Sequence, residues 1–161
     1  MSAMNSSSEI SPASRLSQVR LAAMNYLALR EHSQLELRNR LRQKCESEEV
    51  ITQALQQLAK EGLQSDERFA DAFVRMRYRQ GKGPRHIAME LSERGVATEY
   101  QSVVLAEHDW FALCREVRER RFGLSAIESP KEKARQLRFL QYRGFTSDQI
   151  RYAMKAEISE E

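Results

Sequence analysis

Residues 62–95 of this 161-residue chain read GLQSDERFADAFVRMRYRQGKGPRHIAMELSERG. The pattern predicts the end of one helix at Gly62, a second helix that begins at Ser65 or Asp66, a basic turn, and a third helix that stops at Gly95. Glycine is typical just past a helix end because it adopts the left-handed conformation without a steric cost. The second helix is predicted to bury three side chains: Phe69, Phe73 and Met76.

The basic turn is unusually free of acidic residues. From Arg75 to Arg85 the chain carries five Lys or Arg residues and no Asp or Glu. Such a run suits a partner with negative charge. The alternative is a solvated helix face that binds nothing, and one charge run alone does not distinguish the two.

The composition is that of a folded, highly charged helical protein. Charged residues make up 30% of the chain and hydrophobic residues 41%, with three prolines, six glycines and a net charge of +3. The first residues do not resemble a signal peptide, and no apolar run approaches the roughly 20 residues that span a bilayer. Cys45 and Cys114 lie far apart without metal-ligand spacing, so we expect reduced thiols and a cytoplasmic location.

Working outward from residues 62–95, apolar periodicity and cap signals predict further helices on both sides. They begin near residues 14, 33, 47, 98, 109, 129 and 146, which gives about nine helices in all. Ser33, Thr98 and Ser129 each precede a Glu or Gln by three residues, the spacing of a capping box. No alternating β-branched run indicates a strand.

An internal repeat groups these helices in threes. Residues 91, 95, 96 and 98 match residues 140, 144, 145 and 147 at a constant offset of 49 (91 to 140), and Leu37 and Leu41 match Ile87 and Leu91 at an offset of 50 (37 to 87). The sequence therefore predicts an all-α fold of three tandem three-helix repeats of about 50 residues that form an elongated, modular array. The predicted segments are a disordered tail (1–13), three repeats (14–63, 64–108 and 109–156) and a frayed acidic tail (157–161).

No catalytic constellation is evident. The three histidines, His32, His86 and His108, share no helix face, and the Gly81-Lys82-Gly83 turn lacks the spacing of a phosphate-binding loop. We therefore expect no enzyme activity, no cofactor and no metal. A hydrolase that depends on His86 or Cys114 is the weakest alternative.

Arginine-rich segments are the candidate binding residues. The predicted partner- or DNA-binding set is Arg75, Arg77, Arg79, Lys82, Arg85, Arg118, Arg121, Lys131, Arg135 and Arg138. The planar guanidinium group suits bidentate contacts with carboxylate or phosphate. Nearby Phe and Tyr residues offer base stacking, although such residues at helical spacing are more often core. Residues 48–71 are net acidic, and an acidic segment beside a basic one favours a protein partner with mixed charges.

The sequence resembles the RecX family of bacterial regulatory proteins over nearly all of residues 16–155. The densest matching residues are Gly62, Leu63, Asp66, Phe69, Ala70, Arg77, Lys82, Gly83, Pro84, Glu90, Leu91 and Gly95, with similar first and last units at residues 27–41 and 138–145. The resemblance implies tandem three-helix units that lie in the groove of the RecA–DNA filament. It also implies modulation of RecA, mostly inhibition of its ATPase, strand exchange and coprotease activities.

The resemblance further implies a part in DNA repair and the SOS response. The expected partners are RecA protein and the RecA–single-stranded DNA filament, and direct binding to DNA is a further expected property. We expect no association with a membrane and a monomeric chain. The main alternative is a stand-alone helical DNA- or RNA-binding protein that needs no protein partner.

Overall fold

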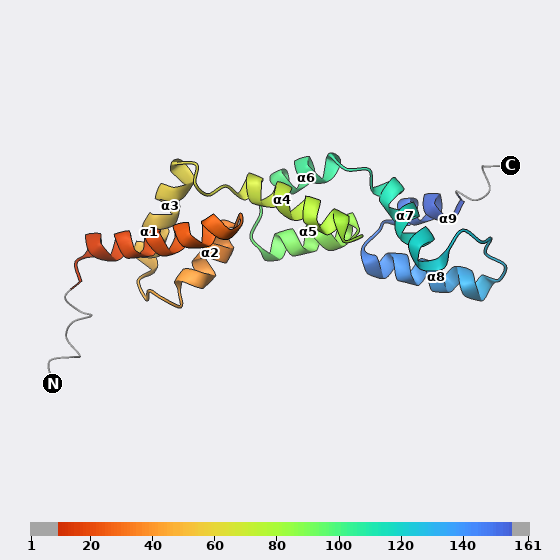
Figure 1. The fold of residues 1–161 in the computed structure, drawn as a ribbon, viewed down its shortest axis with the longest axis horizontal. Helices are drawn as coiled ribbons and strands as arrows, with labels where there is room; N and C mark the ends of the chain where they lie inside the picture. Colours follow the sequence, from red (N-terminus) through yellow and green to blue (C-terminus); the bar gives the residue numbers. More distant parts are fainter. Residues whose placement is uncertain (1–9, 156–161) are drawn as a thin grey trace, which may run out of the picture. The chain divides into compact units, whose positions relative to one another are not determined.

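The computed structural model describes residues 10–155, and this part of the chain forms nine α-helices and no strand (Figure 1). In chain order the helices are α1 (Pro12–Leu29), α2 (Gln34–Leu41), α3 (Glu48–Lys60), α4 (Asp66–Arg79), α5 (Pro84–Glu93), α6 (Thr98–Ala106), α7 (Trp110–Phe122), α8 (Pro130–Arg143) and α9 (Ser147–Lys155). The all-helical fold class predicted from the sequence is confirmed.

Two predicted helix starts are wrong by one or two residues. The Ser11 hydroxyl oxygen accepts a hydrogen bond from the Ser14 backbone N–H at 3.2 Å, so α1 begins at Pro12 and the predicted disordered tail is wrong for residues 12 and 13. Thr98 is not an N-cap, because it is the first helical residue and Ala97 precedes the helix. The predicted tail segments 1–9 and 157–161 lie outside the described residues.

One predicted core side chain is also wrong. Met76 of α4 is 40% exposed, whereas Val74 is fully buried together with Phe69 and Phe73. The buried stripe of α4 therefore consists of positions 69, 70, 73 and 74 and does not include position 76. Both residues are apolar, so hydrophobicity alone did not distinguish them.

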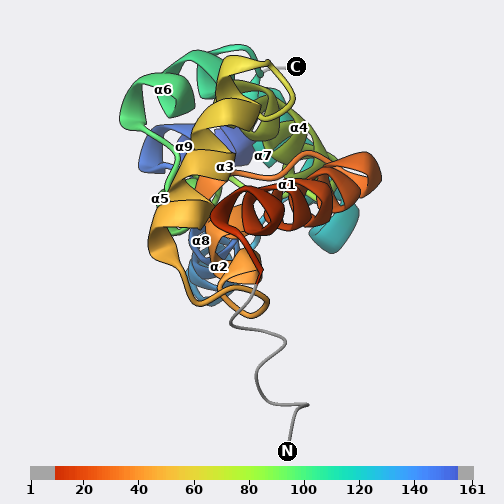
Figure 2. The same ribbon diagram turned by 90° about the vertical axis from the view of Figure 1, so that its left-hand side faces the viewer.

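The chain divides into two compact units, Met1–Phe69 and Ala70–Glu161, so the boundary falls inside α4. In the first unit, α1 packs on both α2 and α3 (Figure 2). The side chains at the centre are almost completely buried, and they are Ala23, Leu37, Leu41, Ile51, Ala54, Leu55 and Leu58. Leu37 and Leu41 therefore face inward, as their spacing predicted.

In the first unit, polar residues of the loop after α1 and of the loop after α3 form hydrogen bonds. The predicted capping box at Ser33 is present, with the Ser33 side chain accepting from the Glu36 N–H at 3.1 Å and the Glu36 carboxylate accepting from the Ser33 N–H at 3.0 Å. Buried Gln64 donates from Nε2 to the His32 carbonyl at 3.3 Å and to the Asp66 carboxylate at 2.9 Å. The bond between Gln64 and the His32 carbonyl fastens the loop after α1 to the loop after α3.

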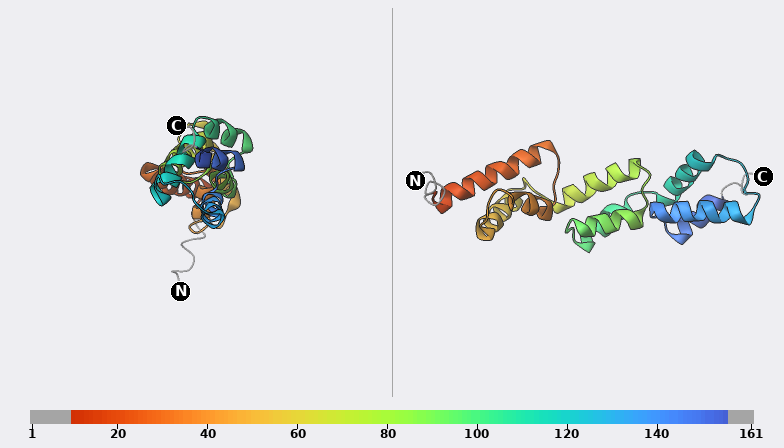
Figure 3. Two further views of the ribbon diagram at one scale, coloured as in Figure 1. Left: turned by 90° about the vertical axis from the view of Figure 1, so that its right-hand side faces the viewer. Right: turned by 90° about the horizontal axis from the view of Figure 1, so that it is seen from below.

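In the second unit, a turn and a helix end meet backbone to backbone. The Gly83 N–H donates to the Arg143 carbonyl at 2.8 Å, and the Arg85 N–H donates to the Gly144 carbonyl at 2.9 Å. A Cβ atom on Gly83 would overlap the Gly144 backbone, and one on Gly144, at φ +101°, would overlap His86. The turn before α5 is therefore fixed against the C-terminal end of α8 (Figure 3).

We expect Gly83→Ala to destabilise the second unit by about 1–3 kcal/mol through overpacking. Gly83 has an ordinary φ of −81°, so the whole loss would come from the added methyl group and none from backbone strain. Urea denaturation followed by circular dichroism measures the change. Lys82→Ala, in the same turn, is the matched control and should change the free energy of unfolding by less than about 0.5 kcal/mol. Equal stabilities of Gly83→Ala and Lys82→Ala would show that the contact tolerates a side chain.

Two titratable groups make the first unit sensitive to acid. Burial lowers the pKa of His32, which is 2% exposed, although its Nδ1 lies 3.0 Å from the Arg30 carbonyl. Burial alone would raise the pKa of Glu36, but hydrogen bonds from Arg30 and from the Ser33 N–H, with the charge of Arg30, lower it overall. In the folded state the neutral imidazole and the ionised carboxylate are therefore both favoured.

The free energy of unfolding should fall as the pH drops. A lowered histidine pKa means that the unfolded chain binds the proton first, so stability is full above about pH 6.5 and decreases below it. Glu36 adds a second loss below about pH 4.3. Urea titrations between pH 7.5 and 5.5 test the first step, and in His32→Gln this step should be absent. A His32 pKa at or above its ordinary value, measured by NMR, would contradict the prediction.

Candidate functional site

Four exposed side chains follow one face of α8. They are Lys131, Arg135, Arg138 and Tyr142, at spacings of four, three and four residues, and we call them the basic stripe. Tyr142 is 85% exposed. At 1.5 Å per residue the stripe is about 16 Å long. A helix that displays three cations and an aromatic ring in one row can follow an extended anionic polymer.

Acidic side chains do little to neutralise the basic stripe. Within residues 10–155 Lys131 and Arg138 have no carboxylate at ion-pair distance, and Arg135 is paired only with Glu132, at 3.4 Å. Both members of that pair are exposed, so solvent screens it and it contributes little. The stripe therefore keeps a net positive charge that a ligand can use.

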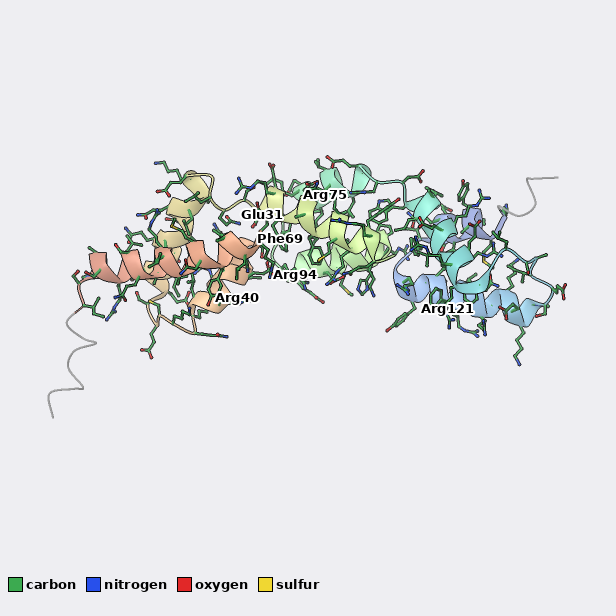
Figure 4. All side chains as sticks on the ribbon, in the orientation of Figure 1. Glu31, Arg40, Phe69, Arg75, Arg94 and Arg121 are labelled. Atoms are coloured by element: carbon green, nitrogen blue, oxygen red, sulfur yellow. The ribbon has the colours of Figure 1, made fainter. Side chains whose placement is uncertain are left out.

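Two phenylalanines beside the stripe hold three guanidinium groups in place. The Phe122 and Phe139 rings meet edge to face, with centroids 5.3 Å apart and planes at 88°. Arg121 lies 5.8 and 5.7 Å from the two ring centroids, Arg135 lies 5.2 Å from Phe122, and Arg143 lies 5.2 Å from Phe139. Figure 4 labels Arg121 beside α8. Cation–π contacts thus restrict the rotamers of these arginines before any ligand binds.

Arg118 does not belong to an accessible surface, and its predicted role in binding is wrong. Its side chain is 1% exposed. Nε donates to Gln136 Oε1 at 2.9 Å, and Nη1 donates to the Ala153 carbonyl at 3.2 Å. Arg118 therefore joins α7 to α8 and α9 inside the second unit, where no partner can reach it.

Arg77 is also held by its own chain. Its guanidinium group contacts the Glu90 carboxylate at 2.7–3.2 Å and donates to Gln80 Oε1 at 2.9 Å. It also stacks over the Phe73 ring, 4.8 Å from the centroid. Glu90 is 8% exposed and pairs with His86 at 3.0 Å as well. Arg77 therefore joins α4 to α5, and its guanidinium group is engaged within the chain and not offered to a partner.

The other residues of the predicted first cluster do not form a single row. Arg75 and Arg79 lie one turn apart on α4, and Arg75, labelled in Figure 4, pairs with Asp71 at 2.6 Å. Lys82 lies half-buried in the turn, and Arg85 is exposed in the first turn of α5. These four cations remain candidates, and Arg79 also donates from Nε to the Arg75 carbonyl at 3.3 Å.

Part of the acidic character expected for residues 48–71 is paired. Glu48 pairs with Arg38 at 3.1 Å and with Arg42 at 2.7 Å, and Glu61 pairs with Arg20 at 3.0 Å. Glu49 and Glu67 are exposed and lie in none of the ion pairs of residues 10–155, so the segment stays net acidic and the mixed-charge protein partner stays a prediction.

The candidate nucleophile is inert. Cys114 is completely buried, and burial raises the pKa of its thiol to about 12, so no reactive thiolate forms near neutral pH. Within residues 10–155 no cluster of His, Cys, Asp and Glu could hold a metal ion, and none of the helices there is long and apolar enough to cross a membrane.

The sequence leaves the role of three aromatic residues open between base stacking and core packing. In the structure Phe122 and Phe139 form the platform for Arg121, Arg135 and Arg143. The spacing could have predicted Tyr142 as a site residue, because it follows Arg138 by four residues and therefore lies on the same helix face as the exposed cations. Its exposure depends on how α8 packs, which the spacing does not fix.

Known proteins with the same arrangement identify the family. Three family models match in order: the first three-helix domain of RecX over residues 20–58, the second over 65–105 and the third over 107–154. The regulatory protein RecX of Halorhodospira halophila is 47% identical over 140 residues, which cover 86% of this chain and 87% of that protein. This chain belongs to the RecX family. The RecX of Pseudomonas entomophila is 42% identical over 134 residues, which cover 82% of this chain and 86% of the relative.

Solved RecX structures share the fold. The crystal structure of RecX from Lactobacillus salivarius superposes with a TM-score of 0.79, covering 91% of this chain and 98% of that one at 21% identity. A second crystal structure of a regulatory protein RecX gives 0.76 at 18% identity, covering 92% of this chain and 75% of the other. The basic stripe lies on the third RecX domain, because residues 131–142 fall within the matched segment 107–154.

Arg118→Ala should destabilise the second unit by about 2–4 kcal/mol, because it opens a cavity and leaves the Gln136 side chain and the Ala153 carbonyl without their donor. Arg138→Ala removes an exposed arginine and should change the free energy of unfolding by less than about 0.5 kcal/mol. Thermal and urea unfolding of the two variants measure the difference. Similar stabilities would contradict the structural role of Arg118.

Proposed function

We propose that this RecX-family chain binds the filament that RecA forms on single-stranded DNA and inhibits its ATPase, strand-exchange and coprotease activities, and so regulates DNA repair and the SOS response. The observation that carries the proposal is the basic stripe on the third RecX domain, which has three exposed cations and, within residues 10–155, a single screened ion pair. Relatives that are 41–47% identical to the chain are also named regulatory proteins.

Inhibition would follow from preferential binding to one state of the filament. RecA subunits must shift against one another during ATP turnover. A chain of linked helical domains that contacts neighbouring subunits binds one subunit arrangement more tightly and shifts the equilibrium toward it. The basic stripe would add contacts to DNA phosphates, each of which releases counterions and makes the affinity dependent on salt.

The proposed mode of action is binding without catalysis. Cys114 is inert, and the histidines serve as packing or ion-pair residues where the structure describes them, with His86 paired to Glu90. The chain would act as a monomer in the cytoplasm, without a cofactor. The four remaining cations of the first predicted cluster, Arg75, Arg79, Lys82 and Arg85, are proposed as a second contact region.

A stand-alone DNA- or RNA-binding protein is the second candidate function. Exposed Tyr142 at the end of a row of cations favours it, since a base can stack on the ring while phosphates contact Lys131, Arg135 and Arg138. The two functions differ in whether RecA is required. Measuring the affinity for single-stranded DNA with and without RecA, at two salt concentrations, separates them.

The triple variant Lys131→Gln, Arg135→Gln and Arg138→Gln should inhibit the single-stranded-DNA-dependent ATPase of RecA at least about tenfold less effectively than the wild type. Three lost phosphate contacts should also reduce the salt dependence of filament binding by about 2 in the slope of log K against log salt concentration. A titration of ATP hydrolysis, from substoichiometric protein upward, measures the inhibition. Circular dichroism verifies folding.

The matched control removes three exposed cations elsewhere: Lys44→Gln, Lys60→Gln and Arg120→Gln. It has the same net charge as the stripe variant and should inhibit as the wild type does. Equal losses in both variants would assign the effect to net charge and remove the stripe from the proposal. Reversing the charges of Arg75, Arg79, Lys82 and Arg85 in the same assay tests the second contact region. A wild-type chain that does not inhibit RecA would exclude the proposed function.

A further inference from the structure

An open groove lies between α8, α9 and the loop that precedes α8. Its volume is about 1140 Å³. The floor is formed by Ile127 of the loop, Leu137 of α8, and Ile150 and Met154 of α9. Ile150 is buried, but the other three side chains are only half-buried, so apolar surface remains exposed to solvent. The helices of the second unit leave this surface uncovered.

Two helix faces line the groove at matching spacing. On α8 the lining residues Lys133, Leu137 and Gln141 recur every four residues, and on α9 Ile150 and Met154 do the same. Two such rows side by side form the trough into which the apolar face of a third helix fits. The geometry therefore suits a helical ligand.

The rim of the groove is positively charged. Lys133, Arg151 and Lys155 line it, and all three are exposed, whereas Glu128 is the only lining carboxylate among the described residues. Asp148 lies 3.4 Å from Arg151, but both groups are well exposed and the pair is screened. A ligand with carboxylates beside an apolar row would complement both the floor and the rim.

We propose that this groove binds an amphipathic helix of a protein partner, with an apolar stripe that contacts Leu137 and Met154 and Asp or Glu side chains that meet Lys133 and Lys155. An anionic lipid or fatty acid has similar chemistry, but sites for small molecules bury most of the ligand. Most side chains that line this groove are exposed, so the part of the chain that the structure describes forms a trough without a cover. A helix, which keeps its outer face in water, fits such a trough.

The groove is separate from the basic stripe. By the period of 3.6 residues per turn, Lys133 and Leu137 lie about 100–160° around α8 from Arg135 and Arg138. The inference therefore extends beyond binding to the RecA filament and does not depend on it.

The test uses the full chain and a fluorescein-labelled synthetic peptide of about 18 residues, long enough for an amphipathic helix, with leucines at helical spacing flanked by glutamates. Fluorescence anisotropy measures the affinity. We expect saturable binding, and about tenfold weaker binding to a peptide with lysine in place of every glutamate. Leu137→Gln with Met154→Gln, and separately Lys133→Glu with Lys155→Glu, should each weaken binding of the glutamate peptide about tenfold.

Lys131→Glu with Arg138→Glu, on the basic stripe, is the matched control and should bind the peptide within about twofold of the wild type, with circular dichroism verifying each fold. Several results would overturn the proposal: no binding, equal binding of both peptides, or a loss that is as large in the stripe control. Binding only after removal of residues 156–161 would assign the groove to the chain's own tail. Binding of dodecanoate but not of the peptide would assign it to an anionic amphiphile.

Discussion

The second unit depends on the close approach of two backbones, those of Gly83 and Gly144. Neither position has room for a Cβ atom, and two backbone hydrogen bonds of 2.8 and 2.9 Å link the turn before α5 to the end of α8. The contact fixes the C-terminal end of the helix that carries the basic stripe. It also places the carbonyl of Gln80 3.3 Å from Arg143, which stacks on Phe139. The contact between Gly83 and Gly144 thus helps to position Arg143 beside the basic stripe.

Arginines in this protein serve two separate purposes. Arg77 and Arg118 have their hydrogen-bonding groups engaged by Glu90, Gln136 and the Ala153 carbonyl, so their charge holds helices together. Arg121 and Arg135 are exposed and lie over half-buried phenyl rings, so their guanidinium edges can still contact phosphate or carboxylate. Binding residues in such a charged helical chain are therefore identified by burial and by neighbours, and not by charge alone.

Local sequence signals predicted the helices well because caps and glycine stops act within a few residues. Ser33 forms its capping box and Asp109 caps α7 as expected, and the apolar periodicity of α2 places Leu37 and Leu41 in the core. The site was predicted less well. Whether an arginine is buried depends on helices distant in sequence, as α9 provides the carbonyl that binds Arg118. The repeat boundaries and their elongated arrangement stay predictions from the sequence.

One helix, α8, presents its core side, the basic stripe and the groove on three different faces. A helix is only about 10–12 Å across with its side chains, so ligands on two of these faces would be held that far apart. Two molecules tethered at such a distance meet at an effective concentration in the millimolar range, even if each binds weakly. Ligands bound at the basic stripe and in the groove would therefore be held side by side on the third domain, and binding of one would favour contact between the two.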